Sequence, residues 1–261
     1  MSLLDQPFGL SGERKAVSIL CLSFYTALYS LLALLFYLSP PGQPEREWVA
    51  PFAALSLTYG VAFFALAADW FWARWYAIGL GYSGLTVAMW GMVTAKSLDP
   101  VLLFYGATHG IVALFLQGKK LSDHFDGQES WRKLLRVDEQ GVEKVGHTVT
   151  RAAASLPTLI LVALAPKEGA SALLVLAGVG LIAVLRNRTA GVLMMLAAGL
   201  ALPLSLLHGH DVAPLHNPTY FQTLLSPGHV HQLGIVSSVL LIAASLPFAR
   251  PALRFLRGQS A

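Results

Sequence analysis

The chain has 261 residues, of which 55% are hydrophobic and 12% charged. Its mean hydropathy of +0.60 lies outside the range of ordinary soluble proteins and within that of polytopic membrane proteins. The single cysteine, Cys21, excludes an internal disulfide framework and cysteine-based zinc or iron–sulfur sites. The formal net charge of +4 reflects cations expected in cytoplasmic loops, so it does not indicate a nucleic-acid partner.

Eight apolar segments follow one another along the chain. A hydrocarbon core about 30 Å thick needs roughly 20 apolar residues for each helical crossing. The predicted spans are 16–39, 48–68, 75–95, 98–117, 151–166, 169–185, 190–207 and 228–248. We therefore predict an all-α, polytopic integral membrane bundle of about eight transmembrane helices. It would form a single membrane domain over residues 1–261, in a bacterial inner membrane.

The positions of lysine and arginine predict the orientation of this bundle, because cationic loops resist translocation. With the N-terminus inside, 15 of the 18 cations fall in the cytoplasm. Only Arg46, Lys96 and Lys167 fall outside. An even number of spans then places both the N- and C-termini in the cytoplasm.

Residues 118–150 form the one sizeable cytoplasmic segment between predicted spans. Within it, Trp131, Leu134 and Leu135 recur at helical spacing among cations, a pattern typical of a helix lying among the headgroups of anionic lipids. The alternative is a solvated linker helix that continues into the fifth span. The stretch SDHFDG, residues 122–127, is expected to be a solvated polar turn, with a weak cation site as its alternative.

Five of the eight histidines lie within 24 residues, in the stretch HGHDVAPLHNPTYFQTLLSPGHVH (208–231). With eight spans, this His-rich loop joins the last two spans on the extracytoplasmic side. Neutral imidazole is a common ligand for zinc, copper, nickel and haem iron, and a carboxylate adds a harder ligand. The predicted ligands of a transition metal (Cu, Zn or Fe) or of haem are His208, His210, Asp211, His229 and His231, with His216 and His109 as additional candidates.

The sequence Ser226-Pro227-Gly228 predicts the start of the last span, with serine as the N-cap and proline at the first helical position. His229 and His231 would then lie in the first turns of that helix, about 200° apart around its axis. Ligands from two adjacent helix ends would form the site: His208 or His210, Asp211, and His229 or His231. The alternatives are a proton-handling or pH-sensing cluster, and histidines without a special role.

His109 is the one strongly ionisable residue well inside a predicted span. Counted from Pro100, it lies about 13.5 Å below the outer end of the span, near the middle of the bilayer. Ionisable residues are costly at that depth and usually functional. The alternative is a neutral histidine that is hydrogen-bonded between helices. A haem held by His109 and His231 is disfavoured, because His231 is expected about 7 Å nearer the outer face.

The third span contains GYSGLTVAMWG, residues 81–91. This stretch is similar to the G-x-S-G, followed by a glycine seven residues later, of the nucleophile helix in rhomboid intramembrane proteases. The resemblance implies Ser83 as a nucleophile and His109, at similar depth on the next span, as its base. Rhomboids also carry an H-x-x-x-N stretch and a further span between these two residues, and neither is present here.

Several functions are therefore open from the sequence. The leading hypothesis is an inner-membrane protein whose outer-facing His cluster binds a transition metal for metal or redox chemistry at the periplasmic surface. The main alternatives are a transporter or channel that uses His109 as a midplane proton or substrate site, and a membrane subunit of a larger respiratory or assembly complex. A fourth is an intramembrane hydrolase with Ser83 and His109. The expected partners are the lipid bilayer and other membrane proteins.

Overall fold

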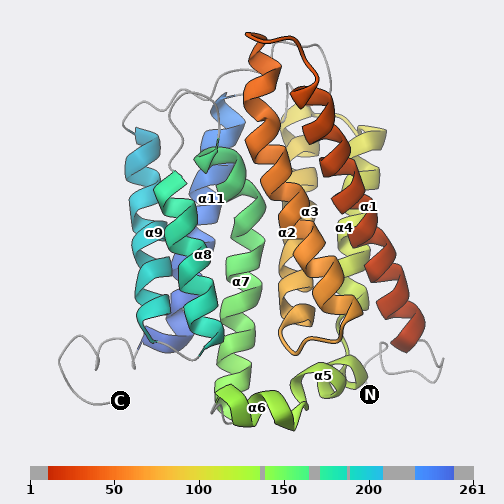
Figure 1. Cartoon of the computed structure of the whole chain (residues 1–261), viewed down its shortest axis with the longest axis vertical. Helices are drawn as coiled ribbons and strands as arrows, with labels where there is room; N and C mark the ends of the chain where they lie inside the picture. Colours follow the sequence, from red (N-terminus) through yellow and green to blue (C-terminus); the bar gives the residue numbers. More distant parts are fainter. Residues whose placement is uncertain (1–10, 136–138, 165–170, 187–188, 208–226, 250–261) are drawn as a thin grey trace.

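The computed structural model describes residues 11–135, 139–164, 171–186, 189–207 and 227–249. Within these ranges the regular structure is entirely helical (Figure 1). The elements are α1 (Ser11–Tyr37), η2 (Pro44–Trp48), α2 (Val49–Ala67), α3 (Ala73–Ala95), α4 (Pro100–Phe115), α5 (Lys119–Asp126), α6 (Glu129–Leu135), α7 (Glu139–Ala163), α8 (Ser171–Leu185), α9 (Thr189–Leu207), α11 (Pro227–Ser245) and η3 (Leu246–Phe248). Each of the eight apolar segments predicted from the sequence overlaps a helix, although α7 begins well before the fifth segment, 151–166.

Three helices in the described ranges are long and apolar enough to cross a membrane, namely Gly12–Tyr37, Arg46–Ala67 and Ala73–Thr94. The helices α4 and α5 give a fourth candidate if they are taken together, although a bend of 70° separates them. The apolar parts of α8, α9 and α11 are shorter. The fold is thus an all-helical bundle with three or four candidate membrane-spanning helices.

The long helices pack as two rings of four (Figure 1). In the first ring each of α1 to α4 contacts the next, and α4 closes on α1. In the second, α7, α8, α9 and α11 contact one another in the same order, and α11 closes on α7. The rings meet where α3 and α2 pack on α7. The segment with α5 and α6 therefore separates two units that share the same helix-to-helix connectivity.

Small residues bring α3 and α7 close together at the joint between the rings. A Cβ atom at Gly79 would lie 2.4 Å from the carbonyl oxygen of Thr150 and 2.6 Å from Cβ of Ala153. A larger residue at position 79 would therefore push the two helices apart. Such small residues are typical of helices that associate in lipid, where close backbone packing supplies the attraction.

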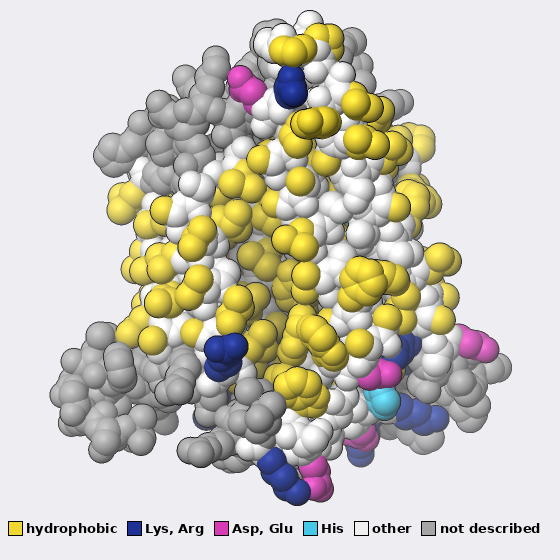
Figure 2. Space-filling model, viewed as in Figure 1, with side chains coloured by type: hydrophobic (Ala, Val, Ile, Leu, Met, Phe, Trp, Pro, Cys, Tyr) yellow, Lys and Arg dark blue, Asp and Glu magenta, His cyan; other side chains and the backbone are white. Residues whose placement is uncertain are grey.

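The outer surface of the bundle carries many large apolar side chains. Leu20, Leu57, Phe64 and Val93 each expose more than 60% of their surface. Figure 2 shows hydrophobic side chains over the middle of one face, with charged side chains gathered toward its ends. Such a band would be costly in water but is readily covered by lipid chains. The surface is therefore compatible with an integral membrane protein.

Candidate functional sites

The predicted metal ligands His208, His210, Asp211 and His216 lie outside the described residues. The helices on either side of them are described. The helix α9 extends to Leu207, and α11 begins at Pro227, as the sequence predicts for the last span. His229 and His231 therefore lie in the first turns of α11. In the part of the chain that the structure describes, no group of three or more His, Cys, Asp or Glu residues is arranged to hold a metal ion.

The two helices that flank the His-rich loop are direct neighbours. The hydroxyl of Ser238 on α11 donates a hydrogen bond to the carbonyl oxygen of Gly199 on α9, at 2.5 Å. A Cβ atom at Gly199 would lie 3.0 Å from Ile242 of α11. In Figure 1 the end of α9 and the start of α11 lie at the same end of the bundle. The loop therefore begins and ends on two packed helices.

His109 is enclosed in the first ring and is 1% exposed. Its Nδ1 lies 2.8 Å from the carbonyl oxygen of Tyr105, one turn earlier on α4. Its Nε2 lies 2.8 Å from the hydroxyl oxygen of Tyr59 on α2. Because a carbonyl oxygen only accepts, this network assigns the hydrogen of a neutral ring to Nδ1, and Nε2 accepts from Tyr59. A substrate or a water molecule at His109 would have to displace one of these bonds.

Three tyrosines contact this imidazole and a fourth, Tyr29, packs on two of them. We call Tyr25, Tyr29, Tyr59 and Tyr105 the tyrosine cluster. The ring centroids of Tyr25 and Tyr105 lie 4.2 and 4.1 Å from that of His109, and Tyr59 meets it edge-on at 5.7 Å. The hydroxyl oxygens of Tyr29 and Tyr105 are 3.1 Å apart. The cluster joins α1, α2 and α4. The cluster is not predicted from the sequence, although Tyr25 and Tyr29, and likewise Tyr105 and His109, have the i, i+4 spacing that could have indicated it.

Ser83 on α3 lies beside this site but faces another direction. It is buried, and its hydroxyl has no hydrogen-bond partner among the described residues. Gly79, one turn earlier, packs on α7, whereas Gly84 packs on the ring of His109. Since successive helix positions differ by about 100°, Ser83 shares the α7-facing side with Gly79. In the dyad implied by the rhomboid resemblance, Nε2 of His109 would have to give up its hydrogen bond with Tyr59 and form one with Ser83. The dyad stays a prediction.

At the opposite end of the bundle from the end of α9 and the start of α11, ion pairs tie α5 to the turn between α2 and α3. Asp69 in this turn has a left-handed backbone (φ 55°), which lets the amide of Trp70 bond the carbonyl of Ala65 at 3.0 Å. The carboxylate of Asp69 accepts from Nζ of Lys15 at 2.6 Å and contacts Nε2 of His124 at 2.9 Å. One carboxylate thus joins α1, the turn and α5.

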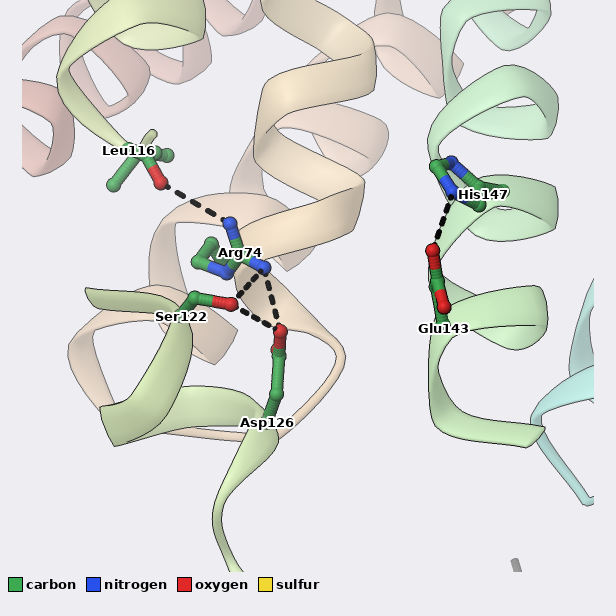
Figure 3. Close-up of polar contacts among 6 residues, drawn as sticks. All are labelled: Arg74, Leu116, Ser122, Asp126, Glu143 and His147. Carbon is green, nitrogen blue, oxygen red and sulfur yellow. Dashed lines mark hydrogen bonds and ion pairs between the residues drawn. The ribbon is translucent and has the colours of Figure 1, made fainter. Parts of the chain in front are cut away.

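A second ion pair fixes the bend between α4 and α5 (Figure 3). The guanidinium of Arg74 lies 2.6 Å from the carboxylate of Asp126 and also donates to Ser122 and to the carbonyl of Leu116. The hydroxyl of Ser122 donates to Asp126 at 2.7 Å. Both charged side chains are largely buried. The side chains of this α5 network are Lys15, Asp69, Arg74, Ser122, His124 and Asp126.

The prediction that residues 122–127 form a solvated turn was therefore wrong. These residues mostly belong to α5, because Leu121 and Phe125 lie one turn apart and are both buried under it. The helix predicted around Trp131 is present as α6. The ring of Trp131 packs on Phe71 at 5.2 Å, so this side of α6 covers the turn between α2 and α3.

The α5 network gives the stability of the protein a defined pH dependence. Burial alone would raise the pKa of Asp69, but the hydrogen bonds and charges of Lys15 and His124 outweigh it and hold that pKa below its ordinary value. A carboxyl with a lowered folded-state pKa stabilises the protein above its unfolded-state pKa, and this contribution is lost as the pH falls through the folded-state pKa.

We therefore expect the unfolding temperature of the wild type to fall more steeply than that of Asp69→Asn as the pH is lowered from about 5 to about 3. The measurement is thermal unfolding in detergent, followed by circular dichroism at several pH values. Parallel curves for the two proteins across this range would contradict the assignment.

Comparisons of this chain with protein-family models, with curated proteins and with solved structures found no match.

Proposed function

We propose that this chain is a bacterial inner-membrane protein that binds a transition metal in its His-rich loop, residues 208–231, for metal or redox chemistry at the extracytoplasmic surface. The packing of α9 on α11 is the observation that supports this proposal. It places Leu207, the last residue of α9, and Pro227, the first of α11, at one end of two adjoining helices. Ligands from both sides of the loop can then reach one ion.

The distribution of charge supports the orientation in this proposal. Arg14, Lys15, Arg74 and Lys119 all belong to the end of the bundle that carries α5. At the other end, the described connection between α1 and α2 carries a single cation, Arg46. A positive-inside arrangement puts the α5 end in the cytoplasm and the His-rich loop outside. In the proposed topology all eight long helices cross the bilayer.

The proposed ligands fit the chemistry of zinc, copper or iron. Imidazole nitrogen suits each of these metals, and one carboxylate is available in Asp211. Three protein ligands would leave a coordination position for water or substrate, as catalytic zinc sites do, whereas four would favour a structural or delivery role. The ligands would be drawn from His208, His210, Asp211, His216, His229 and His231.

The first test is metal analysis of the protein purified in detergent without a His tag, together with its ultraviolet–visible spectrum. We expect near-stoichiometric zinc, copper or iron, or a haem band, in the wild type. The metal is lost when His208, His210, His229 and His231 are all replaced by alanine. A matched control replaces His124 and His147, which are exposed at the other end of the bundle, and it retains the metal.

Equal metal content in all of these proteins would contradict the proposal, and so would its absence from all of them. The variant His109→Gln distinguishes this proposal from the transporter alternative. The proposal predicts that the variant retains its metal. A transporter that depends on His109 would lose transport activity although its His-rich loop is unchanged.

A further inference from the structure

Tyr59 and His109 form a donor–acceptor pair within the tyrosine cluster of the first ring of helices. Tyr59 is 0% exposed, and its hydroxyl oxygen lies 2.8 Å from Nε2 of His109. The bond from Nδ1 to the carbonyl of Tyr105 keeps the other nitrogen free of hydrogen and directed at the phenol. The phenol therefore donates directly to a base that can take up its proton.

This arrangement lowers the cost of removing an electron from Tyr59. A phenol that loses an electron becomes strongly acidic, and in a buried site it needs a base at hydrogen-bond distance to release its proton. Nε2 of His109 is at that distance. The base is preoriented, because Nδ1 is already bonded and α3 packs against the ring at Gly84.

We propose that Tyr59 and His109 are a redox-active pair in the core of the bundle. A one-electron oxidant, such as a transition-metal complex in its higher oxidation state, takes an electron from Tyr59. The phenolic O–H bond breaks, and the proton forms a bond with Nε2 of His109. The products are a neutral Tyr59 radical, a His109 imidazolium and the reduced oxidant, and return of the electron and proton restores the starting pair.

Two kinds of contact would stabilise the imidazolium once it forms. The imidazolium would lie with the rings of Tyr25 and Tyr105 centred 4.2 and 4.1 Å from it, within the distance at which aromatic rings attract a cation. Its Nδ1 already donates to a carbonyl oxygen, and that bond strengthens when the ring is charged. Burial of the pair also keeps water away from the radical.

Tyr82 provides a matched comparison on α3. It is 40% exposed, and its hydroxyl oxygen accepts a hydrogen bond from the amide of Gln117 at 2.7 Å. An amide nitrogen cannot take up a proton from a phenol. Tyr82 therefore lies in the same bundle, and its hydroxyl has a polar contact but, in the described part of the chain, no neighbouring base that could take up its proton. The two residues should differ in oxidation even though both are tyrosines.

The test is flash photo-oxidation of the full-length protein in detergent. A ruthenium photosensitiser and a sacrificial electron acceptor supply the oxidant, and electron paramagnetic resonance detects the radical. We expect a long-lived tyrosyl signal in the wild type and in Tyr82→Phe, and its loss in Tyr59→Phe. In His109→Gln a side-chain acceptor remains for Tyr59, but no base does, so the signal is lost while the circular dichroism and unfolding temperature show an intact fold.

A signal that persists unchanged in Tyr59→Phe, or an unchanged rate of formation in His109→Gln, would overturn the proposal. Transient absorption of the wild type in heavy water provides a measurement that needs no variant. Slower radical formation supports coupled proton transfer, and an unchanged rate contradicts it. The pair is tested with an added oxidant, so this result is independent of whether the His-rich loop binds metal.

Discussion

Replacement of Gly84 by alanine is expected to destabilise the bundle by about 3 kcal/mol, because it overpacks the core at His109. The added Cβ atom would lie 2.0 Å from Cδ2 of His109 and 2.2 Å from its Cγ. The ring cannot turn aside without breaking its bonds to Tyr59 and to the carbonyl of Tyr105. The helices α3 and α4 would have to separate instead.

Thermal unfolding in detergent checks this expectation, with Gly178→Ala as the matched control. Gly178 also lies within a helix, α8, but a Cβ atom there would meet nothing within 4 Å. Since alanine is the better helix former by about 1 kcal/mol, Gly178→Ala should unfold at or above the wild-type temperature. An unfolding temperature for Gly84→Ala equal to that of the control would show that the ring of His109 does not fill this space.

The second large effect is expected for Asp126→Ala, which leaves the guanidinium of Arg74 without its carboxylate. The side chains of Arg74 and Asp126 are only 11% and 19% exposed. Removing one partner of a largely buried pair costs about 3 kcal/mol, because the remaining charge is left poorly solvated. The bend between α4 and α5 loses its ion pair to α3 and keeps the hydrogen bonds from Arg74 to Ser122 and to the carbonyl of Leu116.

A comparison with Lys133→Ala isolates the effect of burial. Lys133 pairs with Glu129 one turn away on α6, at 3.2 Å, and the two side chains are 80% and 79% exposed. An exposed pair of this kind contributes about 0.5 kcal/mol or less. Equal unfolding temperatures for Asp126→Ala and Lys133→Ala would mean that the Arg74 pair behaves as a surface contact.

The sequence predicts the helical architecture of this protein well, because hydropathy alone locates long apolar helices. Each predicted span corresponds to a helix, and the start of α11 follows from the proline at position 227. The prediction of a solvated turn at residues 122–127 was wrong. Most of these residues are polar, but they belong to the amphipathic helix α5. Leu121 and Phe125 are one turn apart and both buried, so a helix gives this segment an apolar side that packs into the core.

The candidate site in the core could be predicted only in part. The position of His109 in a span indicates a polar site, but its partner Tyr59 is fifty residues earlier in the chain. Which residues face each other depends on how each helix rotates about its axis. Apolar composition does not define that rotation when most positions of a helix are hydrophobic. The same limit applies to Ser83, which shares the α7-facing side of α3 with Gly79, and the dyad implied by the resemblance stays a prediction.

The central claim is that the ends of α9 and α11 present histidines to one metal ion, and the ligand shell of that ion tests it most directly. The measurement is an X-ray absorption spectrum at the metal edge of the purified protein loaded with one equivalent of zinc. The account predicts imidazole nitrogen ligands in the wild type, and their loss when His208, His210, His229 and His231 are replaced by alanine. A shell made only of oxygen, or one that the replacements leave unchanged, would contradict it.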